Sequence, residues 1–320
     1  MLARPEALRA SESPDLSRLG KTPDCVLMHA VAKFRRSDAP RTDLLSSINH
    51  LLEVFMAYVY TLANAKGGCG KSTVAFNLAV SFARKGYQTL AIDLDQQGNL
   101  SGALGVDLNK LKLTTHRLLI DEQADISLFL LEPRPRLKLL PNTIDIVADD
   151  LLEAKKVNRD LLLRSKLQPV LHNFDIVIVD TPPAMRAATL NGLAVADTTI
   201  VPVDSSFFAL LGLNQLLQVI AAIRDAHQPN MVLRALTTHF NRRQNLDKQI
   251  RRQVEDFFGP DLVLQTPIHK SVGIVEAIML QKAAIEYSAA TSGAFDFNKL
   301  TQELIEDIAD EQAPFRSALG

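Results

Sequence analysis

The sequence ANAKGGCGKST, residues 63–73, decides the fold, because it sets a glycine-rich loop between a strand and a helix. The preceding AYVYTLA is rich in β-branched and aromatic residues, which favour a strand. The following STVAFNLAVSFARKG has apolar residues at helical spacing and ends in Gly86. A loop in this position turns its backbone N–H groups toward one anion, and the helix N-terminus adds its dipole. The stretch therefore predicts a phosphate-binding loop.

Each residue type in this loop suits one part of a nucleoside triphosphate bound with Mg²⁺. Lys71 is expected to reach the β and γ phosphates, Ser72 to bind Mg²⁺ through its hydroxyl, and Thr73 to touch the α phosphate. Ala65 stands where the strict G-x-x-x-x-G-K-[ST] pattern has glycine, and two glycines after Lys66 compensate for it. The expected nucleotide-binding residues are Lys66, Gly67, Gly68, Cys69, Gly70, Lys71, Ser72 and Thr73.

Acidic residues end two of the predicted strands. AIDLDQQGN carries Asp93 and Asp95, which alternate with Leu94 and so share one face of a strand. DIVIVDTPP is an apolar strand that ends in Asp180, the form of an acid that accepts a hydrogen bond from Mg²⁺-bound water. The carboxyl ends of parallel strands meet at one edge of a sheet, so we expect these acids beside the phosphate loop, where an acid can orient the attacking water or hold the Mg²⁺ shell.

Four segments in a fixed order carry a family resemblance. KGGCGKST resembles the deviant Walker A motif of the ParA/MinD family of ATPases, and AIDLDQQGN resembles that family's DxDPQGN. DTPP has the family's D-x-P-P form, and VPVDSSFFALLGLNQLL resembles its VPxxxxxxALxGxxxLL. The resemblance spans roughly residues 57–290 and implies that the protein binds ATP and Mg²⁺.

The resemblance implies a role for each charged residue. Lys71 would serve the ATP of its own subunit, while Lys66 would cross a dimer interface to the partner's ATP and couple dimerisation to nucleotide. Asp95 matches the family's hydrolytic aspartate and Asp93 the acid nearer the loop lysine, whereas Gln96 replaces a proline. We therefore expect Lys66, Lys71 and Asp95 to be catalytic, and Ser72, Asp93 and Asp180 to hold the metal.

The rest of the chain predicts an α/β fold with a P-loop NTPase-like, twisted and mostly parallel sheet that has helices on both faces. Further strands are expected at LKLLP, TTIVPVD, LRALTTHF and DLVLQTPI, and helices at DDLLEAKKVNRDLLLRSKL and ALLGLNQLLQVIAAIRDA. Residues 1–55 read as a disordered N-terminal extension, residues 56–312 as the ATPase domain and residues 313–320 as a frayed tail.

Composition excludes several classes of protein. The chain of 320 residues carries a net charge of −1 and two cysteines, too few for a disulfide framework, which fits a reducing cytosol. It lacks a run of about 18 apolar residues and an apolar signal segment, so we expect no membrane span. The acidic C-terminal segment differs from the basic amphipathic helix of membrane-positioning relatives. Cys25 and Cys69 are not placed for an iron–sulfur cluster like that of the nitrogenase-reductase relatives.

One basic segment, FNRRQNLDKQIRRQVEDFFG, is a candidate DNA-binding surface. On a helix from Asn245 to Phe258, residues Leu246, Ile250, Val254 and Phe257 would form an apolar stripe, with Lys248 and Arg252 on the opposite face and Arg251 at its edge. Such a face can neutralise phosphates without reading bases. An ordinary solvated helix face is the alternative. The candidate residues are Arg242, Arg243, Lys248, Arg251, Arg252 and Lys270.

The resemblance implies a cytoplasmic, nucleoid-associated ATPase that cycles between two states. An ATP-dependent homodimer would bind non-specific DNA, and a ParB-like or other cargo adaptor would stimulate slow hydrolysis and release it, so that a plasmid or chromosome locus is segregated. A protein cargo, such as carboxysomes or chemoreceptor clusters, would fit the same cycle. The loop would also suit an amidoligase-type enzyme, as in cobyrinate or dethiobiotin synthesis, or a catalytically silent DNA-binding scaffold that depends on ATP.

Overall fold

The protein is seen in a computed structural model that describes residues 57–155, 158–205 and 213–319. The extension expected over residues 1–55 lies outside them. The described strands form one sheet of seven, in the order β3-β4-β2-β5-β1-β6-β7. Every neighbouring pair is parallel except β3 with β4. The predicted α/β fold with a mostly parallel sheet is therefore confirmed.

The strands follow the apolar segments of the sequence. β1 pairs with β5 on one side and β6 on the other. Ile176 and Ile178 of β5 pack into one helical layer, while Val177 and Val179 pack into the other, which explains the uninterrupted apolar run. The strand bounds are β1 Tyr58–Leu62, β2 Thr89–Asp93, β3 Leu131–Arg134, β4 Leu137–Leu140, β5 Ile176–Asp180, β6 Thr198–Asp204 and β7 Val232–Thr238.

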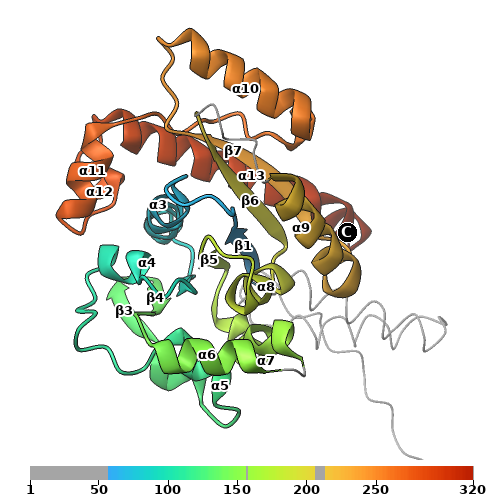
Figure 1. Ribbon diagram of the computed structural model, residues 1–320. Helices are drawn as coiled ribbons and strands as arrows, with labels where there is room; N and C mark the ends of the chain where they lie inside the picture. The colour runs from blue at the N-terminus through green and yellow to red at the C-terminus, as the bar shows by residue number, and fades with distance from the viewer. Residues whose placement is uncertain (1–56, 156–157, 206–212, 320) are drawn as a thin grey trace, which may run out of the picture. The chain divides into compact units, whose positions relative to one another are not determined.

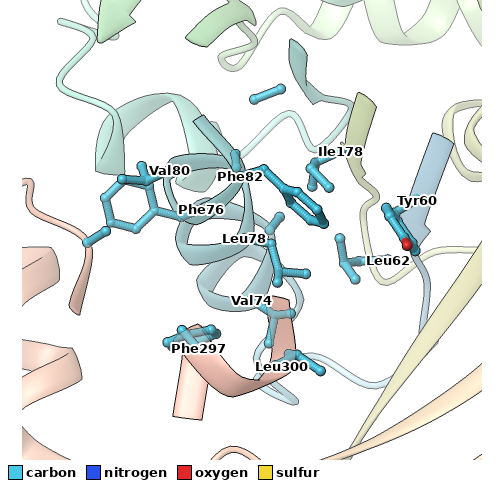
Figure 2. Close-up of a cluster of buried hydrophobic side chains, with 14 of the residues drawn as sticks. Tyr60, Leu62, Val74, Phe76, Leu78, Val80, Phe82, Ile178, Phe297 and Leu300 are labelled. Carbon is cyan, nitrogen blue, oxygen red and sulfur yellow. The ribbon is translucent and has the colours of Figure 1, made fainter. Parts of the chain in front are cut away.

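The helix that follows the phosphate loop, α3 (Lys71–Arg84), is the centre of one layer (Figure 1). Its residues Val74 and Leu78 belong to a buried cluster with Leu62 of β1 and Phe297 of α13 (Figure 2). Because α3 is buried on nearly every side, it is fixed firmly against the sheet, and the loop at its N-terminus is fixed with it. The other helices of this layer are α11 Val272–Met279, α12 Ala284–Tyr287 and α13 Ser292–Leu319.

The opposite face of the sheet is covered by helices from the middle of the chain (Figure 1). They are α5 Thr115–Ile120, α6 Ile146–Ala154, α7 Leu162–Leu167, α8 Ala187–Ala194, α9 Leu213–His227 and α10 Asn245–Phe258. A short helix, α4 Asn99–Ala103, follows β2 and packs on α3. One-turn 3₁₀ segments are η2 Ile126–Phe129, η3 Arg159–Leu161, η4 Leu171–Asn173 and η5 Pro260–Leu262.

The single helix expected over DDLLEAKKVNRDLLLRSKL is broken. α6 ends when Lys155 adopts an extended backbone, and Asn158 is left-handed with φ 50° before η3 and α7 continue. Residues 156–157 between them lie outside the described chain. The helical spacing of leucines was correct on both sides of the break, but the break lets α6 and α7 bury separate leucines, Leu152 and Leu163, in the same core.

The strand expected over DLVLQTPI does not form, and this prediction was wrong. The segment forms one isolated bridge with β7, Val263 with Ala235, and a second bridge joins Phe240 to His269 just beyond both elements. Between them the chain leaves the ladder, because the N–H groups of Gln265 and Thr266 donate to the carboxylate of Glu303 instead. Pro267 has no N–H to contribute, and pairing resumes at Ile268, whose N–H donates to the carbonyl of Thr237 at 2.9 Å.

The C-terminal helix is longer than expected. α13 runs from Ser292 to Leu319 and so continues through residues 313–319, where the sequence suggests a frayed tail. Phe297, Leu300 and Leu304 on its buried face anchor the first half of the helix on the α3 layer. No helix in the described ranges has both the length and the apolar character needed to cross a membrane.

Gly192 of α8 is expected to tolerate no side chain, because a Cβ there would lie 2.9 Å from Thr181 Cγ2 and 3.2 Å from Leu94 Cδ1. We predict that Gly192→Ala lowers the free energy of unfolding by about 1–3 kcal/mol, measured by denaturant titration. Gly102→Ala is the matched control, since its Cβ would meet nothing nearer than 3.7 Å, and it should be neutral or slightly stabilising. Equal stability of the two variants would show that α8 can move away from the sheet.

Candidate nucleotide-binding site

The loop between β1 and α3 has the backbone of an anion cradle. Gly68 and Gly70 have φ angles of 76° and 95°, which side-chain-bearing residues rarely adopt. Gly70 is the N-cap of α3, so the helix dipole points into the loop. The hydroxyl of Thr238, at the end of β7, donates to the carbonyl of Cys69 at 2.8 Å and holds the far side of the loop. The predicted strand–loop–helix arrangement is therefore present.

Lys71 lies inside this loop rather than in solvent. Its side chain is buried, and its ammonium donates to the backbone carbonyls of Asn64 at 3.0 Å and Lys66 at 3.3 Å. These two backbone carbonyls hold the amine of Lys71 inside the loop. A phosphate oxygen is a stronger acceptor than either carbonyl, so Lys71 can exchange these bonds for a triphosphate without moving its backbone.

A pocket of about 430 Å³ opens over the loop, a volume suited to a small-molecule ligand. It brings Asp95 together with the phosphate loop, as the sequence predicts. The carboxylate of Asp95 accepts from the N–H of Gln97 at 2.9 Å, which fixes the turn after β2. The lining residues are Gly67, Gly68, Gly70, Lys71, Ser72, Thr73, Phe76, Asp95, Gln97, Asn99, Ala103, Pro183, His239 and Ile278.

Asp180 lies directly beneath the loop, buried and without a hydrogen-bond donor among the described residues. Its backbone is level with Asp93 in the pairing of β5 with β2. Burial, and then the charge of Asp93, raise the pKa of Asp180 well above its ordinary value. Ser72 and Lys71 lower the pKa of Asp180, but less than burial raises it, and neither is in hydrogen-bonding geometry with its carboxylate. An unpartnered buried carboxylate next to a loop serine is an arrangement that a cation would satisfy.

Asp93 has a different environment. One of its oxygens accepts from both the N–H and the hydroxyl of Ser101, at 2.9 and 2.7 Å, and the other accepts from the N–H of Asp95 at 3.1 Å. Burial nevertheless raises the pKa of Asp93 from 3.8 to about 7. Its oxygens are thus used to join β2 to α4, so of the two acids expected at the metal, Asp180 fits that role better and Asp93 fits the bracing of Asp95.

These residues fit Mg²⁺ held jointly with a nucleotide. Ser72 offers a hydroxyl, Asp180 offers a carboxylate for metal-bound water, and the phosphates would supply the remaining oxygens, which is the usual mode for Mg²⁺. Among the described residues no group of three or more His, Cys, Asp or Glu side chains could hold a metal by itself. The site therefore suits a metal that enters with the nucleotide.

Lys66, at the front of the loop, makes an ion pair within its own subunit. Its ammonium lies 2.7 and 2.8 Å from the two carboxylate oxygens of Asp204, the last residue of β6. The side chains of Lys66 and Asp204 keep 30% and 16% of their surface exposed. The lysine thus stands at the edge of the pocket, where a second subunit could reach it.

The candidate DNA-binding residues separate into two groups. Lys248 and Arg252 lie on the exposed face of α10, as expected, but Arg251 pairs with Glu255 at 2.9 Å and is only 16% exposed. At the end of β7, the Arg242 guanidinium donates to His269 at 2.8 Å, and Arg243 and Lys270 are exposed nearby in the chain. Of the expected set, Arg251 and Arg242 are therefore engaged within the chain, whereas Lys248, Arg252, Arg243 and Lys270 are exposed.

The rotation of α10 also differs from the expected one. Ile250, Val254 and Phe258 are buried, whereas Leu246 and Phe257, which we placed in the apolar stripe, are 51% and 37% exposed. Asp247 causes the difference, because its carboxylate is drawn inward to accept from the N–H of Asn241 at 2.6 Å. A helix with this spacing satisfies the same periodicity, so the sequence alone could not choose between the two rotations.

Sequence reasoning missed several pocket residues. Ile278 comes from α11, far along the chain, and Phe76 looked like an ordinary core residue of α3. His239 has a left-handed backbone with φ 53°, and its place after a threonine-rich strand gave no signal. Asp204 was visible as a polar strand end, and the pairing of β6 with β1 was the information needed to connect it with Lys66.

Comparisons with known proteins identify relatives of this chain. Residues 57–233 match the family described as "AAA domain". A chromosome partitioning protein ParA of Caulobacter vibrioides is 31% identical over 258 residues, which cover 80% of this chain and 96% of that protein. A cobyrinic acid a,c-diamide synthase of Mycobacterium smegmatis, solved with ADP and magnesium, is 30% identical with a TM-score of 0.64 and covers 72% of this chain and 91% of that one. A putative plasmid partition protein of Borrelia burgdorferi, solved with AMPPNP, shares the fold, with a TM-score of 0.67 at 20% identity over 78% of this chain and 99% of that one.

The fold and the loop define a P-loop nucleotide-binding protein. With these relatives, the chain belongs to the ParA/MinD family of P-loop ATPases. The family resemblance drawn from the four sequence segments is thereby confirmed.

The buried acid at the metal position gives a pH-dependent prediction. The raised pKa of Asp180 means that the folded protein holds a proton there that the unfolded chain releases above about pH 3.8, so stability falls as pH rises. We expect Asp180→Asn, in EDTA and without nucleotide, to leave the unfolding temperature almost unchanged near pH 3.5 and to raise it by several degrees at pH 8, with the gain beginning at about pH 4. Scanning calorimetry measures both. A loss of stability at pH 8 would show that the carboxylate has partners of its own.

Proposed function

We propose that this protein is a ParA-type ATPase in which ATP and Mg²⁺ close a homodimer, the dimer binds non-specific DNA, and hydrolysis releases it. The observation that carries the proposal is the presence of two lysines at one phosphate loop. Lys71 is buried beneath the loop and Lys66 lies at its outer edge. In this proposal one lysine serves the ATP of its own subunit, and the second would serve the ATP of a partner.

Each residue of the pocket has one part in the proposed hydrolysis. The loop N–H groups and Lys71 hold the β and γ phosphates, and Asp95 orients water for attack on the γ phosphorus as the bond to ADP breaks. When bound, Mg²⁺ would neutralise charge on the β and γ oxygens. Lys66 of the partner would stabilise charge in the transition state, as an arginine finger does. Hydrolysis thus requires the dimer.

Such a cycle would serve to position a cargo rather than to make a chemical product. The dimer would hold the nucleoid through cationic side chains on α10 and at the end of β7, in the cytoplasm. A ParB-like or other adaptor on the cargo would stimulate hydrolysis by ordering Asp95 and its water. The intrinsic rate should therefore be slow. The proposed cargo is a plasmid or chromosome locus, and a protein cargo is the alternative.

A second candidate function is amide synthesis on a carboxylate substrate. It is favoured by the likeness to the cobyrinic acid a,c-diamide synthase of Mycobacterium smegmatis. The two functions differ in what ATP produces: a synthase would hydrolyse ATP in step with a carboxylate acceptor, whereas the partitioning cycle would change mass and DNA affinity. Measuring the molar mass with ADP, with ATP and with a slowly hydrolysed ATP analogue separates them.

Removal of the water-orienting acid should trap the ATP state. We expect Asp95→Ala to bind ATP, to form a dimer and to lose at least about 100-fold in phosphate release. Light scattering gives the mass and a phosphate assay the rate. Asp225→Ala is the control, because Asp225 is 75% exposed on α9 outside the site. Normal turnover in Asp95→Ala would remove this residue from its role, and a monomer at saturating ATP would contradict the dimer.

Reversal of the exposed charges on α10 should weaken DNA binding. We expect the double variant Lys248→Glu, Arg252→Glu to lose affinity for non-specific DNA and to reduce the salt slope by about 0.9 for each phosphate contact removed, while ATP-dependent dimerisation is kept. Filter binding at several salt concentrations measures both. Lys110→Glu with Arg224→Glu is the matched control, since these side chains are 86% and 47% exposed elsewhere. Equal affinity of the two double variants would make α10 an ordinary solvated helix.

A further inference from the structure

The pairing register of the sheet dictates which residue faces Lys66. In the parallel ladder of β1 with β6, Tyr60 lies beside Thr198 and Leu62 beside Ile200. The same offset of 138 residues continues beyond β1, where the side-chain amide of Asn64 donates to the carbonyl of Pro202 at 2.6 Å. Two residues further on, this offset brings Lys66 to Asp204. The ion pair is therefore a consequence of the fold rather than a chance meeting of surface side chains.

The backbone of Lys66 is restrained as well as its side chain. Its N–H donates to the side-chain oxygen of Asn64 at 3.0 Å, and its carbonyl accepts from the ammonium of Lys71 at 3.3 Å and from the thiol of Cys69 at 3.2 Å. Asn64 thus links Lys66 to β6 from one side while Asp204 links it from the other. Without nucleotide, the lysine is held toward its own subunit at both ends.

We propose that Asp204 is a positioning residue that keeps Lys66 in its own subunit until ATP is bound, and that dimerisation exchanges Asp204 for the partner's triphosphate as the counter-charge of Lys66. The inference rests on the proposed function, because it needs a partner nucleotide to receive the lysine. It assigns Asp204 a regulatory part in that cycle. The partner for the exchange is a second copy of this chain loaded with ATP.

The geometry suits an exchange rather than a permanent bond. A pair that keeps 30% and 16% of its two side chains exposed is partly screened by water, so it can be broken at small cost. A triphosphate offers Lys66 more negative charge than one carboxylate, which makes the exchange favourable only when the partner carries ATP. An ADP-loaded partner lacks the γ phosphate, so Asp204 then keeps the lysine.

Nucleotide in the same subunit is coupled to this exchange through Lys71. The ammonium of Lys71 donates to the carbonyl of Lys66 as long as no phosphate replaces that acceptor. When Lys71 turns to the β and γ phosphates, the Lys66 backbone loses one of its restraints. The loop therefore links loading of its own pocket to the readiness of Lys66 to cross to the other one.

The first test measures dimerisation with a slowly hydrolysed ATP analogue by analytical ultracentrifugation. Two pairs are broken per dimer, so Asp204→Asn is expected to tighten the dimer dissociation constant by roughly 2- to 30-fold. Asp204→Glu, which can restore the pair, should lie closer to the wild type. In a Lys66→Ala background, Asp204→Asn should have no effect. An unchanged or weaker dimer in Asp204→Asn, or the same shift without Lys66, would overturn the proposal.

The second test needs no dimer and so separates this inference from the proposed function. In the nucleotide-free protein, the amine of Lys66 is labelled with acetic anhydride and quantified by peptide mass, with Lys110 as the internal reference because its side chain is 86% exposed. Lys66 should react several-fold faster in Asp204→Asn than in the wild type. Equal rates would show that Asp204 does not hold the lysine. Lys66 of the wild type could show the expected slow labelling while the protein stays monomeric with the ATP analogue. That result would contradict the proposed function and the exchange of counter-charges, but the restraint of Lys66 by Asp204 would stand.

Discussion

The parallel pairing of β1 with its two neighbours is the constraint on which the site depends. On one side Leu62 lies level with Asp180 of β5, and on the other with Ile200 of β6. The phosphate loop starts two residues beyond Leu62, so the register alone decides that a buried acid lies beneath the loop and that Asp204 lies beside it. A slip of one residue would turn alternate side chains to the wrong face and separate all of these groups.

The same constraint places like charges together in the interior. Asp93 and Asp180 are level on adjacent strands and both are buried, and the charge of Asp93 adds to burial in raising the pKa of Asp180. An apolar residue at position 180 would serve stability better, since the carboxylate has no donor among the described residues. The fold tolerates the acid because α3 and the strands around it bury an extensive apolar cluster. Asp180 thus lowers the stability of the ligand-free protein, and we expect the same carboxylate to favour binding of Mg²⁺ with a nucleotide.

Much of this could be predicted from the sequence, because strong local signals coincide with the fold there. The phosphate loop, the strand ending in Asp180 and the bounds of α10 all follow from glycine spacing and apolar periodicity. The errors arose where a tertiary contact decides. Glu303 accepts from the N–H groups that a strand over DLVLQTPI would have needed. The hydrogen bond from Asn241 to Asp247 fixes the rotation of α10. Neither partner is visible in local sequence, nor is the link between Lys66 and Asp204.

The two lysines of the loop are physically linked. Lys71 is enclosed by the loop and donates to the carbonyl of Lys66, so the amine proposed to bind phosphate also restrains the backbone of Lys66. A single lysine could bind ATP, but in the proposed cycle a second lysine is needed to couple ATP binding to dimerisation. Both restraints on Lys66 come from groups fixed by β1 and β6, so the proposed coupling of ATP binding to dimerisation would depend on sheet geometry rather than on a long-range movement. In the proposed cycle, a small exchange of acceptors at one loop would be sufficient to join nucleotide binding to dimerisation.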